Sequence, residues 1–382
     1  MESPLFDWHS QVGAKLADFG GWQMPIEYPK AIGSLSAGGV IAEHTAVRED
    51  VGIFDVSHLG KIEVSGAGAL LFLNRIFTND LNRIGHGSAQ YNLLCDDSGG
   101  VIDDLIIYRY DDERFFLVPN AANCAAVYAV LEEANDLGLK IKNAHHDFGV
   151  LAVQGPQSAA LLADLGVTVD LDYMAFSEVI FPGHESLGTV IICRTGYTGE
   201  FGYELIPTWN STLPVWELLV AAVEKQGGRI CGLGARDTLR TEMGYPLHGH
   251  ELSLSITPLQ ANAGWAVALK KDAFRGQAAL LTEKAVGVPR ILRGLKSLDR
   301  GIPRGGMSVM DSTGAVVGEV TSGTFSPTLK GGIGLALIKP DIEIGAELTI
   351  CDRTISALKL LERVLKAGAI CDEFGQARSW GE

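Results

Sequence analysis

The chain has 382 residues, of which 47% are hydrophobic and 20% are charged, a balance that suits two or three globular domains and excludes a disordered chain. Its 31 Lys and Arg residues and 46 Asp and Glu residues give a formal charge of −15, which argues against nucleic acid or an anionic membrane as the main partner. No apolar run reaches the roughly 18 residues that span a bilayer, and six cysteines without a CxxC pair predict reduced thiols in a cytoplasmic compartment.

Strands and helices are both expected in the first three quarters of the chain. Short runs of apolar and β-branched residues predict strands at 101–108, 115–118, 149–154 and 189–194. Apolar residues at three- and four-residue spacing predict helices at 124–134 and 213–225. This alternation over residues 1 to about 280 predicts an α+β architecture.

The pattern changes after Lys284. Residues 286–289 are typical of a linker, and glycine-containing turns then follow every 8 to 12 residues or so, which predicts a small β-barrel or sandwich. Farther along, Leu358, Leu361 and Leu365 have helical spacing, which predicts a helix over 356–368.

Several familiar catalytic and metal signatures are absent. The chain has no GxxxxGK[ST] loop, HExxH, GxSxG or GxGxxG motif. Asp55, Ser57 and His58 suggest a triad, but neighbours on an extended chain point to opposite faces and do not form a local relay. His248 and His250 suggest a metal fragment without an identifiable third ligand, so no metal is expected.

The segment 99–108 places two carboxylates inside an apolar strand. In a strand Asp103 and Asp104 point to opposite faces, so they do not form a paired acid–base dyad. A buried carboxylate needs a partner. Each acid therefore either caps a turn or pairs with an arginine, or else one of them faces a cavity as a polar anchor or acid–base group.

A second segment, 194–205, has three glycines in seven residues, with Tyr197 at the expected loop tip and Glu204 on the following strand. An exposed β-hairpin would account for the glycines. The aromatic tip and the acid are also suited to a flat, nitrogen-rich heterocycle.

A third segment, 232–242, is typical of a glycine-rich turn that enters a helix. Arg236 falls near the start of this helix, where its charge opposes the helix dipole. A ligand or a carboxylate would explain the arginine, and a surface salt bridge is the alternative.

Together with four further motifs, these segments resemble the T-protein of the glycine cleavage system, an aminomethyltransferase that uses tetrahydrofolate. The further motifs are GGWQMP at 20–25, FDVSHLG at 54–60, TND at 78–80 and SGTFSPTL at 322–329. The resemblance runs in order from about Pro4 to about Leu348.

The resemblance implies an α+β, three-lobed fold with two α+β lobes and a C-terminal β-barrel around a folate channel. On this reading, residues 1–284 form the folate-binding region, with one α+β subdomain inserted at about 51–140, and 285–382 form the barrel domain. It also implies roles for matching positions. Asp104 would be the catalytic acid beside the folate nitrogens, and Glu204 and Arg236 would hold the pterin. Tyr91 and Tyr197 would flank the ligand, with Asn120 as a polar neighbour.

The implied reaction moves the methylene carbon of an aminomethyl group from the lipoyl arm of the H-protein to tetrahydrofolate, with release of ammonia. Two alternatives stay open: a folate-dependent demethylase of a small methyl donor, and a non-catalytic folate-binding module. The chain departs from the family pattern over about 351–382, so the final barrel strand and any folate contact from this tail are open questions.

Overall fold

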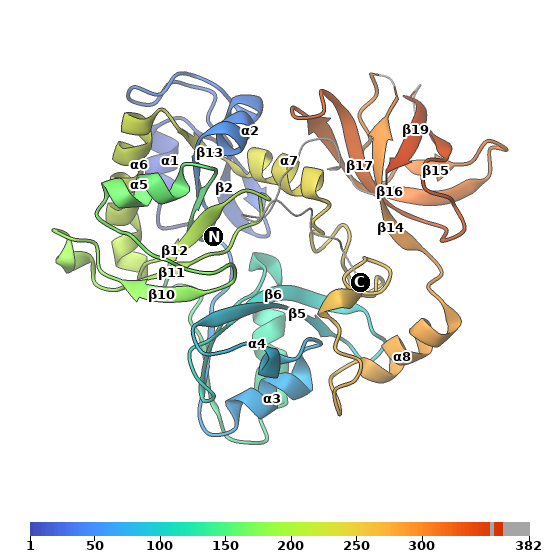
Figure 1. Cartoon of the computed structure of the whole chain (residues 1–382), viewed down its shortest axis with the longest axis horizontal. Coiled ribbons are helices and arrows are strands. Elements are labelled where there is room, and N and C mark those ends of the chain that lie inside the picture. The colour runs from blue at the N-terminus through green and yellow to red at the C-terminus, as the bar shows by residue number, and fades with distance from the viewer. Residues whose placement is uncertain (299, 352–354, 362–382) are drawn as a thin grey trace. The chain divides into compact units, whose positions relative to one another are not determined.

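Figure 1 shows the computed structural model of the chain, which describes residues 1–298, 300–351 and 355–361. The chain divides into two compact units. The first contains residues 1–73, 81–91 and 105–237, and the second contains residues 74–80, 92–104 and 238–382. Each unit therefore combines segments that are far apart in the sequence. The predicted domain boundary between residues 284 and 285 stays a prediction.

The first unit contains a six-stranded sheet with the order β10-β11-β12-β9-β3-β13. The β3–β13 pair is parallel, and the other neighbours are antiparallel. Four of its strands, β3, β9, β11 and β12, are buried throughout and consist mostly of apolar residues, as expected for strands covered on both faces. The bounds are β3 Gly52–Asp55, β9 Leu151–Gln154, β10 Phe176–Val179, β11 Val190–Cys193, β12 Gly202–Ile206 and β13 Arg229–Cys231.

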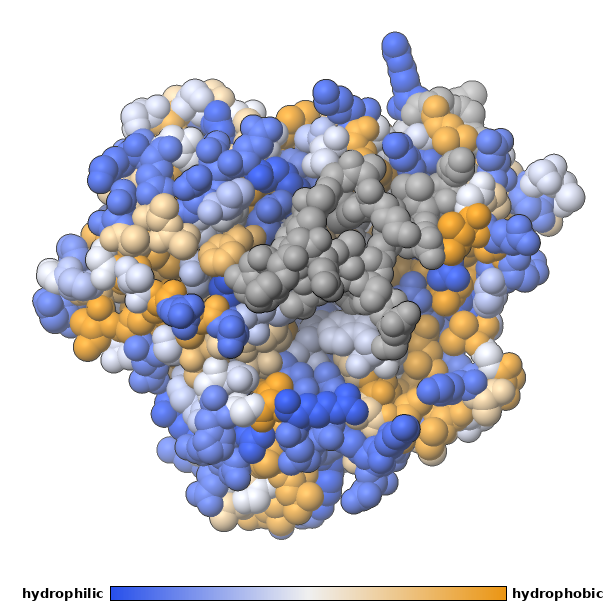
Figure 2. Space-filling model, in the orientation of Figure 1, coloured by the Kyte–Doolittle hydropathy of each residue, from blue (hydrophilic) through white to orange (hydrophobic). Residues whose placement is uncertain are grey.

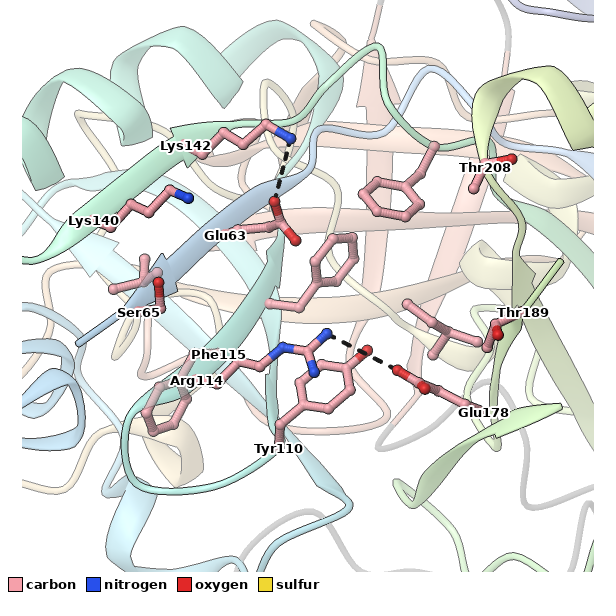
Figure 3. A pocket seen from close by; sticks show the side chains of 14 residues that line it. Glu63, Ser65, Tyr110, Arg114, Phe115, Lys140, Lys142, Glu178, Thr189 and Thr208 are labelled. Atoms are coloured by element: carbon pink, nitrogen blue, oxygen red, sulfur yellow. Dashed lines mark ion pairs between the residues drawn. The ribbon is translucent and has the colours of Figure 1, made fainter. Parts of the chain in front are cut away.

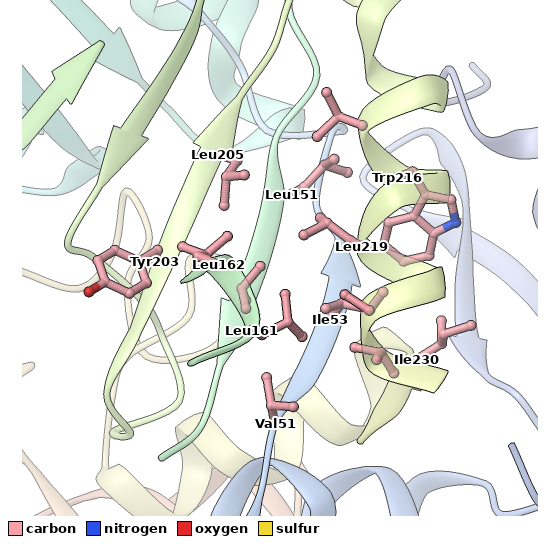
Figure 4. Packing of buried hydrophobic residues seen from close by; sticks show 14 of the residues in the cluster. Val51, Ile53, Leu151, Leu161, Leu162, Tyr203, Leu205, Trp216, Leu219 and Ile230 are labelled. Carbon is pink, nitrogen blue, oxygen red and sulfur yellow. The ribbon is translucent and has the colours of Figure 1, made fainter. Parts of the chain in front are cut away.

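Helix α6 (Thr212–Gln226) packs on this sheet and forms the main core of the first unit. Trp216, Leu219 and Val223 recur at three- and four-residue spacing and are fully buried. Figure 4 shows Leu219 beside Ile53 and Leu151 from the central strands, and the Trp216 ring packs against the rings of Trp8 and His9. The predicted helix over 213–225 is thus confirmed, and it ends at a glycine in the left-handed conformation.

A five-stranded sheet has the order β5-β6-β7-β4-β8. Strands β5 and β6 each contain residues of both units, and the division in β6 falls between Asp104 and Leu105. The predicted strands over 101–108 and 115–118 correspond to two of its members. The bounds are β4 Ile62–Ser65, β5 Ser88–Cys95, β6 Val101–Arg109, β7 Arg114–Val118 and β8 Lys140–Asn143.

The remaining elements flank these sheets or connect them along the chain. The first unit has a β1–β2 hairpin, and helix α7 begins in the first unit and ends in the second. The bounds are α1 Phe6–Gln11, β1 Lys15–Phe19, β2 Trp22–Glu27, α2 Val40–Glu49, α3 Ala69–Ile76, α4 Cys124–Glu133, α5 Ser158–Asp164, α7 Leu233–Met243 and α8 Gln277–Val286. Among the described residues, no helix is both long and apolar enough to cross a membrane. On the face shown in Figure 2, hydrophilic side chains are interspersed with smaller groups of hydrophobic ones.

The second unit ends in a closed barrel with the order β14-β17-β16-β15-β18-β19, which confirms the predicted C-terminal β-barrel. Its interior is filled by small and branched apolar side chains, among them Leu295, Val309, Val320, Ile338 and Ile350. The bounds are β14 Ile291–Ser297, β15 Ser308–Met310, β16 Val316–Ser326, β17 Gly331–Ile338, β18 Glu347–Cys351 and β19 Ile355–Leu361.

The predicted helix over 356–368 is wrong for its first part, because β19 is a strand. It pairs with β14, where Leu360 is opposite Leu295, and with β18, where Leu358 is opposite Leu348. The leucine spacing fits a helix, but hydrogen bonding to two neighbouring strands decides in favour of the strand. Residues 362–382, with the rest of the predicted helix and the atypical tail, lie outside the described residues.

Candidate functional site

Glu204 is a nearly buried carboxylate in the six-stranded sheet of the first unit. It lies on β12, opposite Cys193 of β11 and Ala152 of β9, and it is 9% exposed. The Thr195 hydroxyl donates a 2.6 Å hydrogen bond to Glu204 Oε2. A carboxylate offers about four acceptor positions, so this bond fixes the carboxylate and leaves acceptor capacity for a ligand.

The loop between β11 and β12 is braced by Gln154 of β9. Gln154 Nε2 donates to the carbonyl oxygens of Thr195 and Tyr203, and Gln154 Oε1 accepts from the Thr198 hydroxyl at 2.8 Å. A Cβ atom at Gly196 or Gly202 would collide with the Gln154 carboxamide. Two of the three glycines of this segment therefore make room for Gln154, which the glycine pattern alone did not indicate.

Arg236 lies against Tyr197, which belongs to this loop. The Arg236 guanidinium carbon is 4.8 Å from the centroid of the Tyr197 ring, a cation–π arrangement. Burial lowers the pKa of Arg236, whereas the negative charge of Glu204 acts in the opposite direction. Arg236 Nη1 is buried and has no hydrogen-bond partner among the described residues. Leaving such a donor unpaired costs about 1–3 kcal/mol, so this atom fits a ligand that supplies an acceptor.

Arg236 is placed by the tight turn into α7. The Gly232 amide donates to Glu43 Oε2 at 2.9 Å, and the Tyr28 amide donates to Glu43 Oε1 at 2.6 Å. A side chain at Gly232 would collide with the backbone of Ile26. Burial raises the pKa of Glu43 to about 7. Sequence reasoning missed Glu43, because a single acid in a helix carries no sign of the two backbone amides that it holds.

Asp103 and Asp104 belong to the second unit and lie on opposite faces of β6, as predicted. Asp103 is fully buried, whereas Asp104 is partly exposed together with its alternate neighbours Ile102 and Ile106. The turn before β6 is set by Asp96, whose Oδ1 accepts from the amides of Ser98 and Gly100. The predicted catalytic acid is thus the carboxylate on the partly exposed face.

The two other predicted site residues belong to the first unit. Tyr91 lies on β5, and Asn120 lies at the N-cap of the short helical turn Ala121–Asn123. Both residues are partly exposed. The structure brings together Glu204, Arg236 and Tyr197; the roles of Tyr91 and Asn120 stay predictions.

The Asp55 carboxylate has a structural role, because it accepts hydrogen bonds from three neighbouring groups of the protein. It accepts hydrogen bonds from Ser3 Oγ at 2.7 Å, from the His9 ring and from the Ser57 amide. Burial would raise its pKa, but these hydrogen bonds outweigh burial and lower the pKa to about 2. Burial lowers the pKa of His58 to about 3, and none of these three hydrogen bonds to Asp55 comes from His58.

The two histidines of the suspected metal fragment lie against backbone carbonyl groups. His248 Nε2 is 3.1 Å from the Val101 oxygen, and His250 Nδ1 is 3.0 Å from the Thr321 oxygen. In the part of the chain that the structure describes, no group of three or more His, Cys, Asp and Glu side chains is arranged to hold a metal ion.

Comparison with known proteins identifies the family to which this chain belongs. Residues 5–271 match the GCVT N-terminal domain, and residues 290–357 match the glycine cleavage T-protein C-terminal barrel domain. The chain is 54% identical over 352 residues to the aminomethyltransferase of Mycolicibacterium paratuberculosis and 55% identical over 354 residues to that of Mycobacterium bovis, with 92% of each chain covered in both cases. The structure of the glycine cleavage system aminomethyltransferase T from Bartonella henselae superposes with a TM-score of 0.85 at 33% identity, covering 95% of this chain and 97% of that one.

The fold and these matches define an aminomethyltransferase. The chain belongs to the glycine cleavage T-protein family. The predicted family, the α+β architecture with its C-terminal barrel and the enzyme class are therefore confirmed.

Proposed function

We propose that the enzyme transfers the methylene carbon of an aminomethyl group from the lipoyl arm of an H-protein to tetrahydrofolate. The carbon–sulfur bond and the carbon–nitrogen bond of the aminomethyl group break, and two carbon–nitrogen bonds to folate form. Protons leave the two folate nitrogens and end on the lipoyl sulfur and on ammonia. The products are 5,10-methylenetetrahydrofolate, ammonia and the dihydrolipoyl protein.

The observation that carries this proposal is the group formed by Glu204, Arg236 and Tyr197. A reduced pterin presents N–H donors along its aminopyrimidinone edge, and a fixed carboxylate such as Glu204 can accept two of them. Arg236 Nη1 is a buried donor without a partner among the described residues, which suits the pterin carbonyl oxygen. The Tyr197 ring supplies an aromatic face for a flat ring.

Asp104 is proposed as the catalytic acid. Its partly exposed position on β6 supports a role in orienting the folate and in managing the proton of the attacking nitrogen. The rate should depend strongly on holding the lipoyl arm and folate together, since positioning two reactants removes most of the entropic cost of their encounter. Tyr91 and Asn120 are proposed to contact the folate, as the family resemblance implies.

A cytoplasmic location is also proposed. Four cysteines, Cys95, Cys124, Cys193 and Cys231, are buried and unoxidised in the described part of the chain. Buried free thiols suit a reducing compartment.

The deciding experiment is tetrahydrofolate-dependent ammonia release from aminomethylated H-protein. We expect ammonia and 5,10-methylenetetrahydrofolate to form in equal amounts. Turnover of small methylated donors without turnover of the H-protein would instead support a folate-dependent demethylase. Folate binding without either reaction would support a non-catalytic module.

A further inference from the structure

The first unit has a pocket of about 390 Å³ whose lining includes none of Glu204, Arg236 and Tyr197. Its lining comes from β4, β7 and β8 of the five-stranded sheet and from β10, β11 and the segment after β12. Figure 3 shows Lys140 and Lys142 on one side of it and Thr189 and Thr208 on the other. The volume is within the range of roughly 300–1,000 Å³ that is usual for small-molecule sites.

Strand register places two cations around a hydroxyl group in this pocket. Ser65 of β4 is opposite Lys140 of β8 on one side and opposite Arg114 of β7 on the other. Directly opposite residues in a sheet have Cβ atoms about 5 Å apart and point to the same face. Lys140, Ser65 and Arg114 therefore form one row of three donors across the sheet.

The neighbouring row on the same face of the sheet, which contains Glu63 and Lys142, has less net positive charge than the row of Lys140, Ser65 and Arg114. Glu63 is opposite Lys142, and Lys142 Nζ lies 3.5 Å from Glu63 and 2.5 Å from Asp147. The positive charge of Lys142 is thus already paired. Lys142 is consequently the least suited of the three pocket cations to bind an added anion.

Lys140 and Arg114 have more of their charge available. No ion pair to Lys140 occurs among the described residues, and Arg114 has only a 4.0 Å approach to Glu178. The Arg114 guanidinium carbon lies 4.1 Å from the centroid of the Tyr110 ring. An arginine over an aromatic ring can keep N–H groups available to donate to an oxyanion.

Part of the remaining lining is aromatic and apolar. Phe116 packs edge-to-face against Phe148, with ring centroids 5.4 Å apart, and Ile191 of β11 lines the opposite side. Apolar surface beside a pair of cations is complementary to a molecule that has a flat apolar part and a charged end.

We propose that this pocket binds a small organic anion, with its oxyanion held by Lys140, Ser65 and Arg114 and its aromatic part on the partly exposed Phe148. The shared chemistry is an aryl group joined to a carboxylate or a phosphate. This inference does not rest on the folate reaction, because none of these residues belongs to the Glu204 group.

The test is calorimetric titration of the full chain with phenyl phosphate, phenylacetate, inorganic phosphate and phenol. We expect phenyl phosphate or phenylacetate to bind with a saturable isotherm and more tightly than inorganic phosphate or phenol. Tighter binding of phenyl phosphate assigns the site to phosphate esters, and tighter binding of phenylacetate assigns it to carboxylates. Absence of saturable binding by both aryl anions overturns the proposal.

Variants tie the binding to this pocket. Arg114→Gln and Lys140→Gln should each weaken binding of the preferred aryl anion roughly tenfold or more, since each removes a charge-assisted hydrogen bond. Lys225→Gln removes an exposed lysine that pairs with Asp164 outside the pocket, and it should leave the affinity unchanged. Arg114, Lys140 and Lys225 are all exposed residues, so circular dichroism should report intact folding of each variant. Equal affinity in Arg114→Gln, Lys140→Gln and the unchanged chain would place the anion elsewhere and overturn the proposal.

Discussion

Thr195 donates a 2.6 Å hydrogen bond to the carboxylate of Glu204 across the loop that joins β11 and β12. The donor and the acceptor are both nearly buried, so the bond is protected from water. Because the hydroxyl fixes one carboxylate oxygen, the orientation of Glu204 toward a ligand depends on a residue that need not touch the ligand. Thr195 is thus a positioning residue for the proposed pterin contact.

Substitution of Glu204 by glutamine should weaken folate binding. A glutamine at this position would keep the shape but replace one acceptor oxygen with a donor, so we expect the KM for tetrahydrofolate to rise roughly tenfold or more. Thr195→Val should raise KM by a smaller factor with little change in kcat, and Thr195→Ser should restore it. The exposed Glu217 gives a matched control, and Glu217→Gln should leave both constants unchanged. An unchanged KM in Glu204→Gln would remove Glu204 from the binding site.

The neighbouring acids of β6 should give different phenotypes. Asp104→Asn should bind tetrahydrofolate and fold normally, while kcat falls by roughly two orders of magnitude or more, the usual scale for general acid–base catalysis. Asp103 is fully buried, so Asp103→Asn should mainly lower the melting temperature. Steady-state kinetics and thermal unfolding of both variants check this separation. Near-normal turnover in Asp104→Asn would rule out its catalytic role.

The buried carboxyl group of Glu43 should make stability depend on pH. Burial raises its pKa from 4.5 to about 7 in the folded protein, so the folded state holds a proton that the unfolded state has lost. The stabilisation is complete below about pH 4.5 and is lost as the pH rises through about 7, a change of up to about 3 kcal/mol. Urea unfolding between about pH 5 and pH 8 should therefore show a falling free energy of unfolding.

The matched comparison for this prediction is Glu43→Gln, in which position 43 does not titrate. Its free energy of unfolding should fall less over the same pH interval. Other titrating groups, including His58, are present in both proteins and cancel in the difference. Parallel pH profiles for the two proteins would show that Glu43 does not carry the effect.

Gly196 should not tolerate a side chain, because a Cβ atom there meets the carboxamide of Gln154. We expect Gly196→Ala to destabilise the protein by about 1–3 kcal/mol, the usual cost of overpacking, and to weaken folate binding through the displaced loop. Gly85 has no positive φ angle, and no atom lies within 4 Å of the place that a Cβ would take there. Gly85→Ala is therefore the control and should be neutral. Chemical denaturation of the two variants tests the contrast.

Sequence patterns predict features that depend on local periodicity. The opposite faces of Asp103 and Asp104 follow from the two-residue repeat of a strand, and the buried face of α6 follows from the spacing of its apolar residues. Contacts between distant segments are not predictable in this way. Gln154 lies far upstream of the glycines that accommodate it, and Glu43 holds an amide at Gly232; neither relation leaves a local pattern.

The strand β19 is a second example of this limit, because there a local pattern predicted the wrong kind of element. Leu358 and Leu361 satisfy helical spacing, but their conformation is decided by hydrogen bonding of β19 to β14 and β18, which begin upstream. The resemblance to the family predicts that Glu204 and Arg236 contact one ligand, and their proximity depends on how β12 and α7 pack in the first unit.

Closure of the barrel by β19 also sets how far the chain can be shortened. A chain that ended at Cys351 would leave one edge of β14 and one edge of β18 with unpaired backbone groups. Exposed strand edges of this kind pair readily with other copies of the same chain. Residues 355–361 thus cover two strand edges that would otherwise be open to pairing, in addition to closing the barrel.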